Sequence, residues 1–158
     1  MSALSPKSVP VTLFDLAQRF VGVKEAAGAH ANPAVLAMLQ LDTQWPDDDS
    51  VSWCSAFVNY CAWLLRLPRS KSLAARSWLA VGRPVSLDDV PIGFDVAILS
   101  RGDGPQPGPD VLNAPGHVGI VAGVDATTVH LLGGNQGDSV NITSFPRSRV
   151  LGVRRLLD

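Results

Sequence analysis

The stretch SWCSAFVNYCAWLL, residues 52–65, decides the fold of the first half of the chain. Apolar side chains recur in it at helical spacing and form one wide face. The preceding residues 45–50, WPDDDS, disfavour a helix, because the residue before proline is pushed out of the α region and Asp and Ser favour caps. The sequence therefore predicts a helix that has Ser50 or Ser52 as its N-cap and continues to about Arg66.

Cys54 falls near the second or fourth position of this helix, depending on which serine caps it. The free N–H groups and the helix dipole at that end favour negative charge, so a thiolate is stabilised there. Such a cysteine is either a nucleophile or a buried core residue. Cys61 lies two turns deeper and is expected to pack in the core. Seven helical residues rise roughly 10 Å, too far for a disulfide, so we expect two free thiols.

Length and composition indicate one globular domain. The chain has 158 residues, 46% of them hydrophobic and 17% charged, and a net charge of −1. This charge argues against a nucleic-acid or anionic-membrane binder, which usually carries a basic face. No apolar stretch is long enough for a transmembrane helix. We expect residues 1–11 to form an arm, residues 12–158 to form the domain, and the first ten residues to carry no secretory signal.

Three further helices are predicted from their end signals. Thr12 and Asp15 match a capping box for a helix that Gly22 can end. Asn32 followed by proline predicts a second helix over residues 33–41. The third is expected to begin at Ser70 or Ser72 and to continue through Trp78 and Leu79, with Trp78 in the core.

The hydrophobic period changes after Pro84. Runs of β-type residues predict strands over residues 94–99, 117–124, 127–132, 140–143 and 150–154. Residues 101–116 are rich in glycine and proline and are expected to form a long loop. Helices first and an antiparallel sheet second indicate an α+β domain.

The three histidines differ in their settings. His117 opens a strand directly after Pro-Gly, with the small Gly119 on the same face. His130 alternates with apolar residues and should point to the opposite face of its strand from them. His30 lies in a Gly/Ala loop and is expected to be exposed. His117 is the strongest candidate for chemistry, with a structural histidine as the alternative.

A cysteine at a helix start and a histidine at the first edge of a following sheet form the arrangement of papain-like thiol hydrolases. The imidazole takes the thiol proton and later protonates the leaving amine, and a third group orients it. If strands 117–124 and 127–132 form a hairpin, Asn135 at the exit of the second lies near His117 at the start of the first. Asn135 alternatively only supports a turn.

Several motifs resemble those of the CHAP-type and NlpC-type cell-wall cysteine hydrolases, particularly the small group found in phage lysins and bacterial toxic effectors. The resemblance covers residues 12–155, and its motifs are Gly22–Glu25, Asn32-Pro33, Trp53–Val58, Ala75–Leu79, Gly116–Val121 and Leu132–Asp138. It implies a papain-like α+β fold, with Cys54 as nucleophile, His117 as base and Asn135 as the orienting residue. Trp53 and Gln136 would contact substrate, and Trp53, Trp78 and the 101–115 loop would border the groove, with core packing as the alternative for both tryptophans and the favoured one for Trp78.

Two departures leave the third catalytic residue open. Many CHAP proteins carry a glutamate two positions before the asparagine, where this chain has Gly133. Many NlpC-type enzymes use a second histidine, for which His130 is the candidate. For the oxyanion, the backbone N–H of Cys54 is a better donor than Gln136, because it sits at the helix start.

The resemblance implies a peptidoglycan hydrolase that cuts the stem peptide or acts as an N-acetylmuramoyl-L-alanine amidase. It would be made in the cytoplasm and act in the periplasm or cell wall, as a phage-type lysin or a toxic effector such as a type VI secretion cargo. An immunity protein or a secretion apparatus would then be its partner. No metal or other cofactor is expected, because zinc sites want clustered ligands and only Cys54 and Cys61 are close in sequence. A catalytically inactive module that binds the wall or a protein is the alternative.

Overall fold

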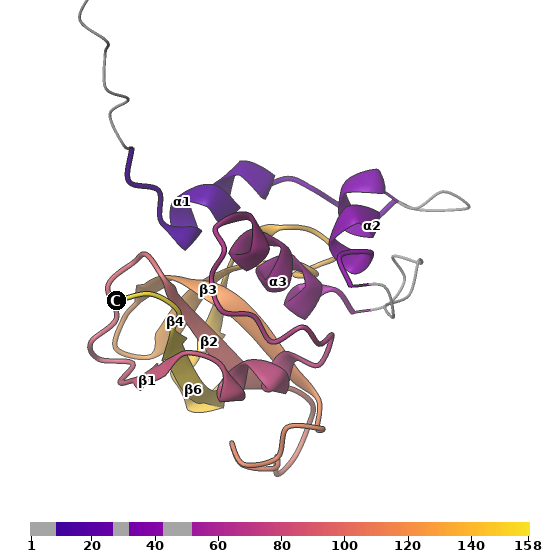
Figure 1. Cartoon of the computed structure of the whole chain (residues 1–158). Helices are drawn as coiled ribbons and strands as arrows, with labels where there is room; N and C mark the ends of the chain where they lie inside the picture. The colour runs from indigo at the N-terminus through magenta and orange to yellow at the C-terminus, as the bar shows by residue number, and fades with distance from the viewer. Residues whose placement is uncertain (1–8, 27–31, 43–51) are drawn as a thin grey trace, which may run out of the picture.

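The computed structural model describes residues 9–26, 32–42 and 52–158. Within these ranges the helices come first and a six-stranded antiparallel sheet follows, which confirms the α+β class (Figure 1). The α-helices are α1 (Leu13–Ala17), α2 (Pro33–Leu39) and α3 (Cys54–Leu64), and the 3₁₀ helices are η1 (Gln18–Phe20), η2 (Ala75–Ala80) and η3 (Arg147–Arg149). The strands are β1 (Arg83–Val85), β2 (Asp95–Ser100), β3 (Gly116–Val124), β4 (Thr128–Gly133), β5 (Asn141–Pro146) and β6 (Val150–Arg155).

The capping signals predict the starts of α1 and α2 correctly. Thr12 and Asp15 form the reciprocal hydrogen bonds of a capping box. The side chain of Asn32 accepts a hydrogen bond from the backbone of Ala34, with Pro33 in the first turn. Each cap satisfies a backbone N–H that has no partner within its helix. Most of the predicted arm, including residues 1–8, lies outside the described residues, as do His30 and Ser50.

The start of α3 differs from the prediction. Its N-cap is Trp53 and not a serine, so Cys54 is the first helical residue. The hydroxyl of Ser52 makes no cap. It accepts a hydrogen bond from the Asn135 amide and lies 3.9 Å from the Cys54 sulfur. The Trp53 indole is fully buried and donates to Glu25, which fixes the chain in a non-helical conformation at this point.

The predicted helix after α3 starts later and is a 3₁₀ helix, η2. Residues 70–72 are held in a loop by Asn59, a buried residue of α3. The Asn59 amide donates to the Ser70 hydroxyl, and its carbonyl accepts from the backbone of Lys71, which has a positive φ of 55°. These tertiary hydrogen bonds override the local capping signals of the serines. Trp78 is fully buried, as expected, and its indole donates to Ser55.

The sheet has the strand order β1-β6-β2-β3-β4-β5. The five predicted strands correspond to β2 to β6, with ends shifted by one to three residues. β1 was not predicted, because three residues that include Pro84 carry too little pattern. β3 pairs with β2 from Gly116 onward but with β4 only from Ile120 onward. The first residues of β3 therefore have no neighbouring strand on the β4 side.

Apolar side chains cover both faces of the sheet. The larger core lies between the sheet and the helices, which Figure 1 shows gathered on one side. Trp53, Phe57 and Ile120 belong to it. A smaller cluster on the other face contains Leu99 and Leu131. The larger core holds α3 against β3, because it contains side chains of both. Among the described residues, no helix is long and apolar enough to cross a membrane.

The chain after η1 pairs with the turn between β4 and β5. The backbone of Gly22 donates to Val140, the backbone of Val140 donates to Val23, and Glu25 donates to Asp138, at 2.8–3.0 Å. Lys24 and Ser139 form an isolated antiparallel bridge in the same place. An early segment of the chain is thus hydrogen-bonded to a turn more than a hundred residues later.

Candidate active site

Cys54 lies where α3 and β3 meet. It is the first residue of α3 and only 1% exposed. The imidazole of His117 and the backbone N–H of Val118 both act on its thiol and lower the thiol pKa. The N–H of Val118 is available because β3 extends beyond its pairing with β4 at this end. The sequence prediction that brings Cys54 and His117 together thus agrees with the geometry.

Two opposing effects act on the pKa of Cys54. Burial raises the pKa, while the hydrogen bond and charge of His117, the N–H of Val118 and the Ser52 hydroxyl lower it. The lowering effects win, so the pKa lies below the usual cysteine value. Cys61 on the same helix has no such partners, and burial raises its pKa far above the usual value. Both cysteines are free, as the helix spacing predicts. Only Cys54 has the electrostatic setting of a nucleophile.

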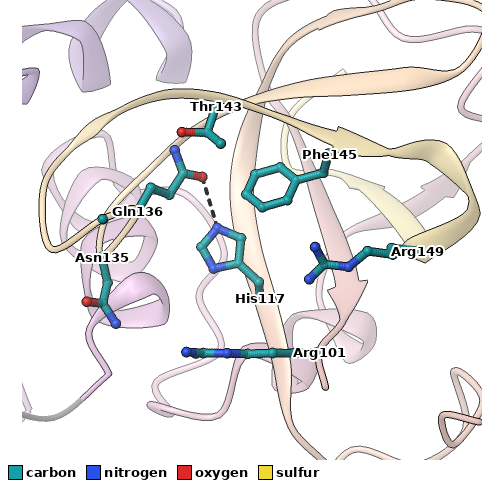
Figure 2. A pocket seen from close by; sticks show the side chains of 8 residues that line it. Arg101, His117, Asn135, Gln136, Thr143, Phe145 and Arg149 are labelled. Carbon is teal, nitrogen blue, oxygen red and sulfur yellow. Dashed lines mark hydrogen bonds between the residues drawn. The ribbon is translucent and has the colours of Figure 1, made fainter. Parts of the chain in front are cut away.

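The side chain next to His117 in the turn after β4 belongs to Gln136. Its Oε1 lies 2.9 Å from the Nε2 atom of His117, as the dashed line in Figure 2 shows. The amide nitrogen of Gln136 donates to the carbonyl oxygens of Leu131 and Asn141, so the amide oxygen must face the histidine. His117 therefore donates through Nε2, and its Nδ1 is the nitrogen left for the Cys54 thiol.

A network of polar side chains holds Gln136 in this position. Its amide nitrogen also donates to the Asn141 side chain, which in turn donates to the Gln136 carbonyl and the Ser139 hydroxyl. The hydroxyl of Thr143 donates to the same Asn141 oxygen. Gln136 is 6% exposed, and the network satisfies its buried amide. A fully satisfied polar network of this kind is rigid, which suits a group that orients an imidazole.

Gly133 explains how Gln136 can reach His117. A Cβ atom on Gly133 would lie 2.6 Å from Oε1 of Gln136 and 3.5 Å from Nε2 of His117. Any side chain at this position would therefore displace the amide. The glutamate that many CHAP proteins carry here is sterically incompatible with the Gln136 hydrogen bond in this chain.

Asn135 does not take the orienting position predicted for it. Its backbone has a positive φ of 56°, in the left-handed region. Its amide donates to the Ser52 hydroxyl at 3.3 Å, two residues before the cysteine. Asn135 still lines the same cavity as His117 (Figure 2).

His130 is also remote from the pair. One ring nitrogen lies 2.6 Å from the Ser144 hydroxyl and the other 3.1 Å from the Asp125 carboxylate. Both ring nitrogens are thus occupied away from His117. The structure does not bring His130 to the position of a second active-site histidine.

Trp53 and Gln136, the two residues predicted to contact substrate, are both buried, and of the two only Gln136 lines the cavity beside His117. Trp53 is fully inside the core, where its ring packs over Gly134 with no space for a Cβ. The amide N–H groups of Gln136 are committed to protein acceptors and cannot serve an oxyanion. The backbone N–H of Cys54 remains suitable, because the first N–H groups of a helix have no acceptor within it.

Two cavities adjoin the pair, and sequence reasoning missed most of the residues that form them. One, of about 360 Å³, contains His117 in its wall. The other, of about 280 Å³, contains Cys54 together with Ala114 and Pro115 of the long loop. Arg101, directly after β2, lines both. Its position at the carboxyl end of a buried strand was the available signal. Because Arg101 lines both, the two cavities are neighbours, and we refer to them together as the groove.

The long loop beside this groove is anchored by a buried residue, Arg76 of η2. Its guanidinium donates to the backbone carbonyls of Pro107, Gly108, Val111 and Pro115 at 2.9–3.2 Å. These bonds give the loop a defined shape despite its glycines and prolines. In the described ranges, no three His, Cys, Asp or Glu side chains are grouped so that they could hold a metal ion.

Comparison with solved structures finds a match over most of the chain. NlpC1 from Trichomonas vaginalis superimposes with a TM-score of 0.53 and 17% sequence identity, covering 91% of this chain. The fold is papain-like. The match covers 42% of NlpC1, so this chain spans less than half the length of that protein. No protein-family model matches the chain, and no curated protein matches it.

Proposed function

We propose that this protein is a cysteine hydrolase that cleaves amide bonds of peptidoglycan. The observation that carries the proposal is the buried Cys54 thiol at the start of α3, whose pKa His117 lowers, together with the Gln136 oxygen 2.9 Å from Nε2 of the same imidazole. A nucleophile, a base and an orienting group in this order are the parts that thiol-based acyl transfer requires. The papain-like fold agrees with this chemistry.

The reaction follows from the positions of these atoms. His117 Nδ1 takes the thiol proton, and the Cys54 sulfur attacks the carbonyl carbon of the amide. The negative charge that develops on the carbonyl oxygen faces the backbone N–H of Cys54 at the start of α3. The imidazolium then protonates the leaving nitrogen, and the C–N bond breaks to release an amine and leave a thioester. His117 takes a proton from water, which attacks the thioester and releases a carboxylic acid and the thiol.

Gln136 serves this cycle by fixing one orientation of the imidazole. Because its oxygen accepts the Nε2 hydrogen in both protonation states, Nδ1 faces the sulfur and then the leaving nitrogen throughout. The same oxygen stabilises the imidazolium that forms when the thiol is deprotonated.

Peptidoglycan is the proposed substrate because the motifs around Cys54, His117 and Asn135 resemble those of cell-wall hydrolases. Either the stem peptide or the sugar–peptide amide would be cut. The test is digestion of purified muropeptides followed by mass analysis of the products. The parent and Cys61→Ala should release the same fragments, and Cys54→Ala should release none.

The controls separate an enzyme from a binding module. Cys54→Ala and Cys61→Ala each remove one buried sulfur from the same helix, so both should be compared with the parent by thermal unfolding. Release of the same fragments by Cys54→Ala would contradict the proposal. Retention of muropeptide by a parent that cleaves none would indicate a catalytically inactive module.

The proposed substrate also decides where the protein would act. Peptidoglycan lies outside the inner membrane, so we propose that a cytoplasmic copy is harmless and a periplasmic copy lyses the cell. Two kinds of protein meet this condition. One is an effector that a secretion apparatus delivers and against which the producing cell carries an immunity protein, and the other is a phage-type lysin. Expression in a Gram-negative host with and without an added export signal tests it. Lysis should require both the signal and Cys54, and equal toxicity of the cytoplasmic form would exclude the wall as target.

A further inference from the structure

The cavity on the His117 side of the groove has an unusual charge. Its wall contains two arginines and no carboxylate, and it is formed by Arg101, His117, Asn135, Gln136, Gly137, Thr143, Phe145 and Arg149. Figure 2 shows the guanidinium groups of Arg101 and Arg149 directed into the space around the imidazole. The protein as a whole is slightly acidic, with a net charge of −1. The positive charge of this cavity is therefore local.

Arg149 is fixed in place. Its Nε and Nη2 atoms donate to the Ser100 carbonyl at 3.1 and 2.9 Å, and its guanidinium carbon lies 5.3 Å from the centre of the Phe145 ring. Phe145 in turn packs against His117, with ring centres 5.2 Å apart. These contacts hold the side chain and leave its charge without a carboxylate partner among the described residues.

Arg101 is the residue directly after Ser100, so it lies next to Arg149. Its side chain is exposed, and its guanidinium has no hydrogen bond or ion pair within the described part of the chain. Other arginines of this protein, such as Arg69 and Arg155, are paired with aspartates. An unpaired guanidinium beside a second, immobilised one forms a site that a carboxylate matches in charge and shape.

The direction of the reaction assigns this site to one side of the substrate. His117 must protonate the leaving nitrogen, so the part that leaves as the amine lies on the imidazole side of the groove. The cavity that contains both arginines also contains His117, whereas Cys54 lines the other cavity, and Arg101 stands between the two because it lines both. We propose that Arg101, backed by Arg149, binds a free carboxylate on the amine-side portion of the substrate. This inference rests on the proposed amide hydrolysis.

The test compares two muropeptides that differ only in the carboxylate of the residue that carries the released amine, which is free in one and amidated in the other. The parent should prefer the free acid in kcat/KM by about tenfold or more, mainly through KM, because a charge-assisted hydrogen bond is lost in the amide. Arg101→Gln should lose this preference and Arg101→Lys should keep part of it. Arg19→Gln, which removes an exposed charge from η1, should match the parent.

The outcomes separate this inference from the proposed function. Equal kcat/KM of the parent for both peptides, or an equal loss on both in Arg101→Gln, would overturn the carboxylate site while leaving the hydrolase intact. If the parent cleaves neither peptide, calorimetry of each peptide binding to Cys54→Ala still tests the carboxylate site. Tighter binding of the acid that Arg101→Gln abolishes would support the site, and equal binding of acid and amide would refute it.

Discussion

His117 on β3 and His130 on β4 belong to one sheet, and each is hydrogen-bonded to other side chains, but in opposite surroundings. His117 is 6% exposed and lies between a thiol and an amide. The side chain of His130 is 35% exposed and lies between the Ser144 hydroxyl and the Asp125 carboxylate. His117 is thus a candidate base. His130 instead links β4 to Ser144 of β5 and to Asp125 of the turn before β4 at the protein surface.

The difference teaches that residue types alone do not make an active site. Ser144, His130 and Asp125 are the three types of a serine hydrolase triad, and they are hydrogen-bonded in that order. However, Ser144 lies exposed on a strand and not at a helix start, and the Asp125 carboxylate accepts three hydrogen bonds from its own turn. The Cys54 site differs in its buried nucleophile at the first turn of α3 and in the groove that reaches it.

The largest expected difference between the two histidines is in catalysis. His117→Ala should lower kcat/KM on muropeptides by about a thousandfold or more, because the thiol loses its base and the leaving amine its acid. His130→Ala should keep most of the activity of the parent. Measured product release, with circular dichroism to confirm folding of both variants, makes the comparison. A similar loss in both variants would show that His130 takes part.

Gln136 and Asn135, the two turn residues that line the cavity of His117, should differ in a second and smaller effect on catalysis. Gln136→Ala should lower kcat by about tenfold to a hundredfold, since the imidazole loses the acceptor that orients it. Asn135→Ala should cost less, because its amide contacts Ser52 and not His117. The pH profile of kcat/KM should change in Gln136→Ala and not in Asn135→Ala. A larger effect at Asn135 than at Gln136 would restore the assignment made from the sequence.

The cysteines provide a third comparison, through the pH dependence of thiol labelling. Because the pKa of Cys54 is lowered, the folded parent should react with iodoacetamide below the pH at which a free cysteine reacts. His117→Ala should shift this profile upward, whereas His130→Ala should leave it in place. Cys61, whose pKa burial raises, should label only on unfolding. A profile that His117→Ala does not move would argue against an effect of His117 on the Cys54 thiol.

The smallest effect is expected at Asp125. Hydrogen bonds from Thr128 and from the backbone of Thr127 hold its pKa below the ordinary value of 3.8. A carboxylate with a lowered folded-state pKa stabilises the fold above its unfolded pKa, and this contribution is lost as pH falls through the folded-state value. Asp125→Asn should therefore lower Tm slightly at pH 7, and the difference in Tm from the parent should shrink as the pH is lowered towards the folded-state pKa of Asp125. A difference in Tm that is constant with pH would contradict this linkage.

Local signals in the sequence predicted the features that depend on neighbouring residues. The capping box of α1 and the Asn32 cap of α2 are complete within a few residues, and both are present. The strands from β2 onward follow the hydrophobic runs. Cys54 and His117 could also be predicted as candidate site residues, because the start of a helix and the start of a strand are local features of the sequence. Their proximity follows from the α+β order of helices and strands.

Features that depend on tertiary contacts were not predictable in the same way. Ser70 and Ser72 suggested a cap, but the Ser70 hydroxyl and the Ser72 backbone carbonyl accept hydrogen bonds from the Asn59 amide of α3. Gln136, and not Asn135, contacts His117 because of the positive φ at Asn135 and the missing side chain at Gly133. No local sequence pattern predicts either feature. Arg101 becomes visible only when β2 and β3 are placed side by side.

The backbone pairing of residues 22–25 with residues 138–140 has a consequence for the ends of the chain. This pairing closes the turn that carries Gln136, through Val23, Val140 and the Glu25 to Asp138 hydrogen bond. Deletion of the first helix, or a fusion that pulls on it, would therefore loosen the acceptor behind the imidazole. A truncated protein can then fold around α3 and still lose turnover, although every residue that contacts the thiol is present.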